Sequence, residues 1–142
     1  MYVYDGRYGR VAFLANPRTG SKACALALMD AGFQMHGSHH SGLESMGRAA
    51  HLDYTSIACV VRGLEDTVQS WCRKLGMTPT HFLREELPRQ VAIINGWGAW
   101  TLFPHSRWAT TIIEYEDLEQ ELNDWITFHT ELDPVELEWV DD

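Results

Sequence analysis

The chain has 142 residues, of which 45% are hydrophobic and 22% charged, a composition ordinary for a globular protein of one domain. Its net charge of −9 is unevenly spread: residues 114–142 hold 12 acidic residues and no Lys or Arg, whereas residues 1–113 hold all 11 basic residues against 8 acidic ones. Nucleic-acid binding generally needs Lys and Arg clustered on one face. We therefore expect a single domain over residues 1–142 with an acidic C-terminal end, and no nucleic-acid partner.

No apolar run approaches the ~20 residues that a membrane-spanning helix needs. The first residues, Met1–Asp5, lack the pattern of a signal peptide. Three cysteines, an odd number, fall in apolar segments, which is typical of buried thiols in a reducing compartment: Cys24, Cys59 and Cys72. We expect a cytoplasmic protein without membrane contact. The sequence leaves its oligomeric state open.

The first informative segment predicts a strand, a tight turn and a helix. The apolar run Val11–Leu14 predicts a buried strand, which breaks at Asn16-Pro17. A helix is expected over residues 21–31, with Gly32 as its C-terminal stop. The first N–H groups of a helix are unpaired, and its dipole favours negative charge there. This junction, with the cations Arg18 and Lys22, therefore predicts a phosphate- or sulfate-binding loop.

The loop departs from the Walker A motif, which places a Lys and then a hydroxyl directly after its second glycine. Here Ser21 follows Gly20, and Ala15 stands where the first glycine belongs. The run Pro17-Arg-Thr-Gly-Ser21 resembles instead the 5′-phosphosulfate loop of the sulfotransferases, which use 3′-phosphoadenosine-5′-phosphosulfate and need no metal. The resemblance implies that this donor is bound by Arg18, Thr19, Gly20, Ser21, Lys22 and Ala23.

A second match follows at another strand-to-helix junction. The run 56–61 predicts a strand that ends in Arg62, and a helix is expected over residues 64–75. A guanidinium at this place suits a phosphate. An Arg at a strand end, with a Ser eight residues later and an aromatic after it, resembles the 3′-phosphate motif of the same family. The resemblance assigns the 3′-phosphate to Arg62 and Ser70, with Trp71 beside them.

The segment between the two motifs holds the candidate bases. A short strand is expected over residues 33–36 and a helix over 43–51, with an irregular, glycine-flanked stretch between them. In the family that the chain resembles, a His or Glu in this region takes the acceptor's proton. We favour His40, then His39, with Glu44 in reserve, and Lys22 as the cation that stabilises the leaving oxygen. The alternative is that these are loop or surface histidines.

The remaining chain predicts a helical stretch from Thr78-Pro79 towards residue 100, a strand over 109–114 and a helix over 116–132. Tyr115-Glu-Asp-Leu118 resembles a segment found later in many sulfotransferases. Four aromatic residues either wall a ligand pocket or belong to the core: Trp97, Trp100, Phe103 and Trp108. Strands that alternate with helices favour an α/β fold. With the motifs, they predict a three-layer P-loop-type domain with a parallel sheet of about four or five strands.

These motifs imply a sulfotransferase that moves a sulfuryl group from 3′-phosphoadenosine-5′-phosphosulfate to a hydroxyl or amine of a small-molecule or glycan acceptor. Lys22-Ala23 departs from the family's loop, and the chain lacks the glycine-rich, lysine-bearing C-terminal segment of cytosolic members. A non-catalytic nucleotide-binding module on the same fold is therefore the alternative. Ser21 in the Walker lysine position and Arg62 at the strand end argue against a small P-loop kinase.

Overall fold

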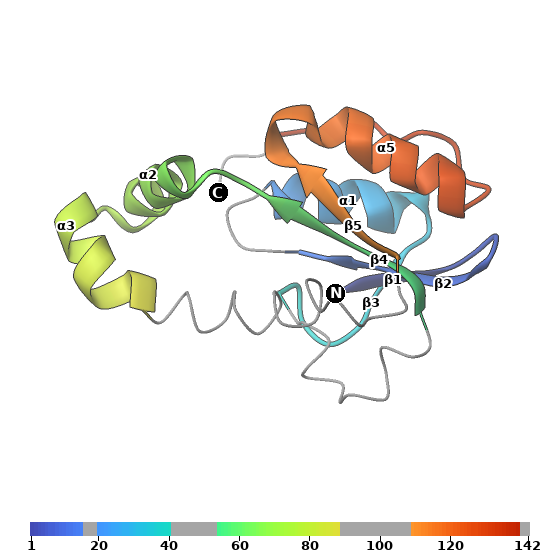
Figure 1. Cartoon of the computed structure of the whole chain (residues 1–142), viewed down its shortest axis with the longest axis horizontal. Coiled ribbons are helices and arrows are strands. Elements are labelled where there is room, and N and C mark those ends of the chain that lie inside the picture. Colours follow the sequence, from blue (N-terminus) through green and yellow to red (C-terminus); the bar gives the residue numbers. More distant parts are fainter. Residues whose placement is uncertain (16–19, 41–53, 89–108, 140–142) are drawn as a thin grey trace.

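The computed structural model describes residues 1–15, 20–40, 54–88 and 109–139. It shows an α/β protein with one five-stranded sheet (Figure 1). The strands are β1 (Tyr2–Gly6), β2 (Gly9–Leu14), β3 (Gln34–Met35), β4 (Tyr54–Val61) and β5 (Ala109–Glu114). The helices are α1 (Ser21–Ala31), α2 (Leu64–Leu75), α3 (Pro79–His81), which continues as a π-helical turn over Phe82–Glu86, and α5 (Leu118–His129), which follows a 3-10 turn over Tyr115–Asp117.

The sheet is mixed, which corrects the expectation of a wholly parallel one. Its order is β3-β1-β2-β4-β5. The centre is parallel as predicted, because β2 pairs with β4 and β4 with β5 in parallel. Strand β1 was not predicted, and it runs antiparallel to both of its neighbours, β2 and β3. It enters the sheet through a hairpin, since Gly6 and Gly9 pair across a two-residue turn.

The far end of this hairpin is held against the C-terminal end of α5. The backbone N–H of Arg7 donates to the His129 carbonyl over 2.7 Å, and its guanidinium donates to the Thr130 carbonyl over 2.7 Å. A Cβ at position 6 would collide with the same His129 carbonyl, so glycine is required there. A cation that reaches the last carbonyls of a helix satisfies groups that have no partner within the helix.

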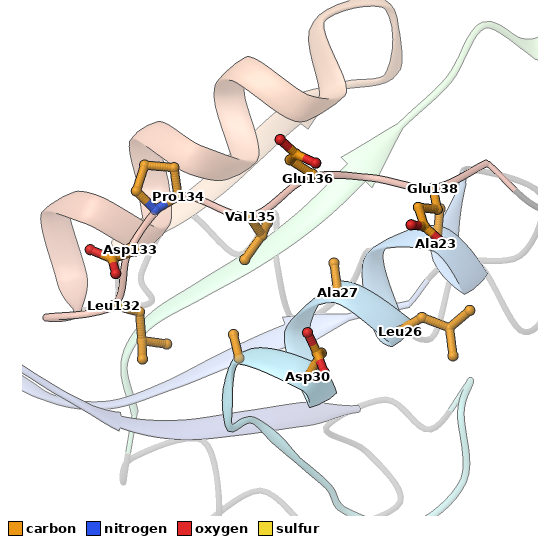
Figure 2. A pocket seen from close by; sticks show the side chains of 11 residues that line it. Ala23, Leu26, Ala27, Asp30, Leu132, Asp133, Pro134, Val135, Glu136 and Glu138 are labelled. Carbon is orange, nitrogen blue, oxygen red and sulfur yellow. The ribbon is translucent and has the colours of Figure 1, made fainter.

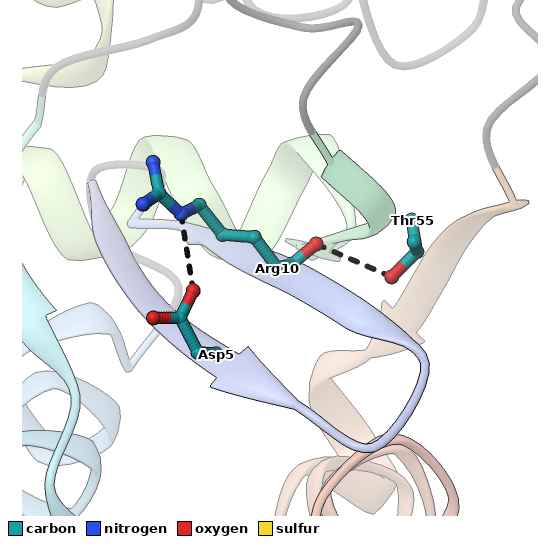
Figure 3. A network of polar contacts seen from close by, with 3 residues as sticks. All are labelled: Asp5, Arg10 and Thr55. Carbon is teal, nitrogen blue, oxygen red and sulfur yellow. Dashed lines mark hydrogen bonds and ion pairs between the residues drawn. The ribbon is translucent and has the colours of Figure 1, made fainter.

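A second tie links the hairpin to the start of β4. The β2–β4 register shifts between Arg10 and Val11, and Thr55 Oγ1 donates to the Arg10 carbonyl over 3.2 Å (Figure 3). The Arg10 side chain forms an ion pair with Asp5 across the hairpin, with an Nε–Oδ1 distance of 3.3 Å. Exposed pairs of this kind contribute about 0–1 kcal/mol, so the backbone pairing carries most of the stability here.

Helices α1 and α5 cover one face of the sheet (Figure 1). Alternate strand residues point to opposite faces, so Val11 and Phe13 face these helices while Ala12 and Leu14 face away. Trp125 of α5 lies in this core and donates its indole N–H to Ser56 Oγ over 2.9 Å. The opposite face is buried as well, through Met1, Val3, Ala12, Leu14, Tyr54, Ile57 and Cys59. Burial on both faces is usual for a sheet with a parallel centre.

Several predicted elements coincide with the observed ones. Helices α1 and α2 and strand β5 have the expected bounds, and Thr78 Oγ1 accepts from the N–H of His81 as an N-cap. Helix α5 is shorter than the predicted 116–132, because a 3-10 turn precedes it and Thr130 is extended, with φ −132° and ψ 170°. The predicted helix over 43–51 and the aromatic group Trp97, Trp100, Phe103 and Trp108 lie outside the described residues.

Residues 130–139, which we call the C-terminal strap, run back from the end of α5 towards the start of α1 (Figure 2). Asn123 of α5 holds the strap with two hydrogen bonds: its Nδ2 donates to the Val135 carbonyl over 2.8 Å, and its Oδ1 accepts from the Val135 N–H over 2.7 Å. The N–H of Leu137 donates to Glu119 Oε2 over 2.9 Å, and the Leu137 side chain is buried in the core. The strap is therefore a fixed part of the fold.

Candidate functional site

The junction between β2 and α1 has the geometry that the sequence predicts on either side of the loop. Gly20, at the start of α1, has φ 74°, a conformation that favours glycine. A Cβ at this position would lie 2.8 Å from Leu118 Cδ2 and 3.0 Å from the Trp139 ring, so the space also excludes a side chain. Arg18 and Thr19, two of the predicted donor-binding residues, lie outside the described residues.

A cavity of about 370 Å³ opens beside this junction. Four predicted site residues line it together: Ser21, Lys22, His39 and His40. The remaining lining residues come from β1, α1 and α2, and of these only Trp71 belongs to a predicted motif: Tyr2, Ala25, Leu26, Met29, Trp71 and Lys74. Because the first N–H groups of α1, Lys22 and Lys74 all favour negative charge, the cavity suits an anion.

His39 joins β1 to the start of α1 through a chain of hydrogen bonds. Its Nδ1 is bonded to the Tyr2 hydroxyl, and its Nε2 lies 3.2 Å from Ser21 Oγ. The Tyr2 hydroxyl also lies 3.8 Å from Met35 Sδ, a weak acceptor. In the tautomer that is protonated on Nδ1, His39 donates to the Tyr2 hydroxyl. Nε2 of the neutral ring then carries the lone pair that accepts from Ser21. Burial raises the pKa of Tyr2 above its usual value, which keeps its hydroxyl neutral.

His40 is held at the end of β2. Its Nδ1 lies 2.6 Å from the carbonyl oxygen of Ala15, the last described residue before the loop. A carbonyl only accepts, so Nδ1 is the protonated nitrogen and Nε2 of the neutral ring has the lone pair. The ring centroids of His39 and His40 are 4.3 Å apart. Two imidazoles thus lie beside the first turn of α1, each held through its Nδ1.

Arg62 and Ser70, the predicted 3′-phosphate pair, are not among the described residues that line this cavity. The Arg62 guanidinium lies over the Tyr115 ring, 4.1 Å from its centroid, in a cation–π contact. Ser70 is 2% exposed, on the buried side of α2. Its neighbours Trp71 and Lys74, three residues apart and so on one face of the helix, line the cavity instead.

The i, i+3 spacing from the predicted Trp71 is the sequence signal that could have found Lys74. Ala23 is buried and lines a different groove on the other side of α1, so any contact it makes to a ligand in the cavity is through its backbone. Among the described residues, no three His, Cys, Asp or Glu side chains are grouped so that they could hold a metal ion. Glu44, the reserve base, lies outside the described residues.

Comparisons of the chain with protein-family models, with curated proteins and with solved structures found no match. The resemblance to the sulfotransferases therefore depends on the sequence motifs alone. In the part of the chain that the structure describes, no helix has the length and apolar character needed to cross a membrane.

Proposed function

We propose that the chain is a sulfotransferase that binds 3′-phosphoadenosine-5′-phosphosulfate at the β2–α1 junction and transfers the sulfuryl group to a hydroxyl or amine. The observation that carries this proposal is the convergence of Ser21, Lys22, His39 and His40 on one cavity at the start of α1. Ser21 and Lys22, at the described end of the segment that resembles a phosphosulfate loop, thus lie beside two candidate bases. In an α/β sheet, ligands generally bind at the carboxyl ends of the parallel strands, which is where this cavity lies.

In the proposed reaction, the acceptor oxygen or nitrogen attacks sulfur and the bond from sulfur to the bridging phosphate oxygen breaks. Lys22 and the first N–H groups of α1 stabilise the negative charge that grows on the bridging oxygen. His40 takes the acceptor's proton on Nε2, since Nδ1 is held by the Ala15 carbonyl. Lys74 adds a second cation to the cavity wall. No metal takes part in this scheme.

The finer parts of the proposal follow from the family resemblance. They are a three-layer P-loop-type arrangement, a small-molecule or glycan acceptor, and a 3′-phosphate held by Arg62 and Ser70. The last of these requires a rearrangement, because the Ser70 hydroxyl is buried and the Arg62 guanidinium lies on Tyr115. A ligand that exposes Ser70 would also move α2, which carries Trp71 and Lys74.

The proposal is tested by a thermal-shift titration with 3′-phosphoadenosine-5′-phosphate against ATP with magnesium. A ligand that binds only the folded chain raises its melting temperature, so we expect a shift with the former and little with the latter. Transfer of labelled sulfate is then measured over a panel of phenols, sugars and amines. Preference for ATP would reject the proposal, whereas binding without transfer to any acceptor would indicate the non-catalytic nucleotide-binding module.

The chain Ser21–His39–Tyr2 favours a second candidate, acyl transfer or ester hydrolysis. A hydroxyl, an imidazole within hydrogen-bond reach and a third group that orients the imidazole form the arrangement of an activated serine. Ser21 Oγ would attack a carbonyl carbon and give its proton to His39 Nε2, and the N–H groups of α1 would hold the oxyanion. Tyr2 is neutral, so it lacks the charge with which a carboxylate stabilises the imidazolium, and we rank this candidate second.

A fluorophosphonate probe separates the two candidates, because it reacts with activated serines and needs no phosphosulfate. Covalent labelling of the wild type that is lost in Ser21→Ala and in His39→Ala, but kept in His40→Ala, would favour the acyl-transfer candidate. Absence of labelling, with sulfate transfer that depends on His40, would favour the sulfotransferase.

A further inference from the structure

A second cavity, of about 750 Å³, lies on the other side of α1, between this helix and the C-terminal strap (Figure 2). We call it the strap groove. The apolar part of its lining is formed by Ala23, Leu26, Ala27 and Ala31 of α1 and by Leu132, Pro134 and Val135 of the strap. In Figure 2 the side chains of Ala27 on α1 and Val135 on the strap point towards each other across the space between the two segments.

The groove is preformed, because both of its walls are fixed. Helix α1 is packed into the core through Cys24, Ala25 and Leu28. The strap is held by the two hydrogen bonds between Asn123 and Val135 and by the bond from Leu137 N–H to Glu119. Short alanine side chains on α1 leave the space between these walls open. A partner that binds here therefore does not have to order the groove first, which lowers the entropic cost of binding.

Carboxylates form part of the polar lining of the same groove. Asp30 on α1 and Asp133, Glu136 and Glu138 on the strap line it, and all four are exposed. In the described part of the chain none of these four side chains forms an ion pair. Residues 114–142 contain no Lys or Arg that could neutralise them. The groove therefore combines apolar walls with a rim of unneutralised negative charge.

We infer that the strap groove binds a Lys- or Arg-rich segment of a partner protein. Lys and Arg carry a long apolar stem with a cation at its end. The stems match the alanine, leucine and valine walls, and the cations match the four rim carboxylates. Complementary charge speeds association and selects partners. A second copy of this chain fits less well, because the chain carries a net charge of −9 and copies repel one another.

The probe is a short fluorescein-labelled peptide of alternating lysine and leucine, with a peptide of alternating glutamate and leucine as its control. Fluorescence anisotropy measures binding at low and high ionic strength. We expect the wild-type chain to bind the lysine peptide, more weakly as salt rises, and not the glutamate peptide. Failure to bind the lysine peptide at low ionic strength would overturn the inference.

Two charge-reversal pairs locate the binding site. Asp30→Lys/Glu136→Lys changes the rim of the groove, and we expect it to weaken binding by about tenfold or more. Glu116→Lys/Asp124→Lys makes the same change of net charge at exposed residues outside the groove, and we expect an effect below about twofold. Equal losses in both pairs would show a general attraction to an acidic protein and would overturn the inference.

A filling variant tests the shape of the groove without changing its charge. Ala27→Phe, or Ala31→Phe nearer the end of α1, occupies the space between the walls, and circular dichroism checks that the variant is folded. We expect loss of lysine-peptide binding in either folded variant, and unchanged binding would overturn the inference. Sedimentation at several concentrations tests whether a second copy of this chain occupies the groove instead. A wild-type dimer that Ala31→Phe abolishes would assign the groove to that second copy and would overturn the inference.

Discussion

Helix α1 separates two cavities of opposite charge. On one side Lys22 and Lys74 line the smaller cavity together with His39 and His40; on the other, Asp30 and three carboxylates of the strap surround the larger groove. Leu26 lines both. A protein with a net charge of −9 can therefore present a cationic site, because the local arrangement of charges and of the helix N-terminus decides what binds there.

The largest expected effect tests the cationic side. A positioned general base contributes about 10²–10⁴-fold to a rate, so His40→Ala should lower sulfate transfer by that factor while the affinity for 3′-phosphoadenosine-5′-phosphate, from a thermal-shift titration, stays nearly unchanged. Lysine-peptide binding at the strap groove should not change.

His36→Ala is the matched control. His36 lies just before His39 and His40 in the chain but is not among the described residues that line the cavity. It should transfer sulfate at close to the wild-type rate. If the double variant His39→Ala/His40→Ala retained wild-type transfer, neither histidine would be the base.

The next effect concerns Gly20, which precedes Ser21 of the cavity and lies against Trp139 of the strap. Gly20→Ala would place a Cβ in a left-handed backbone conformation and against Leu118 and the Trp139 ring of the strap. We expect the free energy of unfolding, measured in urea, to fall by about 2–3 kcal/mol. Both nucleotide and lysine-peptide binding should weaken in this variant.

Gly76→Ala is the control for backbone strain alone. Gly76 has φ 65°, close to that of Gly20, but a Cβ there would meet nothing within 4 Å. We expect Gly76→Ala to lower the free energy of unfolding by about 1 kcal/mol. Equal costs for the two variants would mean that the contact between Gly20 and Trp139 contributes nothing.

How much of the fold could be predicted from the sequence depends on how close in the chain the residues that specify each element lie. Helices α1 and α2 were predicted with correct bounds because their turn glycines and apolar patterns lie within a few residues of the helix ends. Strand β1 was missed although Tyr2–Tyr4 is rich in β-forming residues, because its five-residue length is ambiguous without its partner. Its direction, which makes the sheet mixed, depends on pairing with β2 and β3.

The site residues show the same difference between local and long-range signals. The sequence predicted four site residues from two segments, the start of α1 and the stretch after β3. The structure brings them together in one cavity: Ser21, Lys22, His39 and His40. Tyr2 and Lys74 were not predicted, since only the tertiary fold brings β1 and α2 to the same cavity. The acidic C-terminal end was predicted from the sequence, but the path of its backbone was not. Residues 130–139 form the strap, because Asn123 and Glu119 bond its backbone to α5.

A smaller effect is expected at Asn123, which holds the C-terminal strap against α5. Asn123→Ala removes both hydrogen bonds to Val135 and frees the middle of the strap from α5. We expect a loss of about 1–2 kcal/mol in the free energy of unfolding, together with weaker lysine-peptide binding, because one wall of the groove is no longer fixed. Nucleotide binding should be unaffected.

Asp124→Ala is the neighbouring control, since Asp124 is exposed and its side chain accepts a hydrogen bond from Gln120 within α5. Its effect on unfolding should stay within about 0.5 kcal/mol. If Asn123→Ala kept full peptide affinity, the strap would hold its place without this side chain, and the preformed groove would have another cause.

The smallest effect lies at His129, where α5 ends and the strap begins. Its Nδ1 is buried without a hydrogen-bond partner in the described part of the chain, and burial lowers the pKa of this imidazole below its usual value. The unfolded chain, in which the pKa is about 6.5, therefore binds a proton more readily than the folded one. The free energy of unfolding is therefore unaffected by this group above about pH 6.5. It falls as the pH drops below that value, because the unfolded state then takes up more protons than the folded one. We expect urea unfolding between about pH 7 and pH 5 to show a shallower loss of stability in His129→Gln than in the wild type. His129 lines neither the cavity nor the strap groove, so ligand binding at pH 7 should be unchanged; a steeper pH dependence in the variant would contradict the assignment.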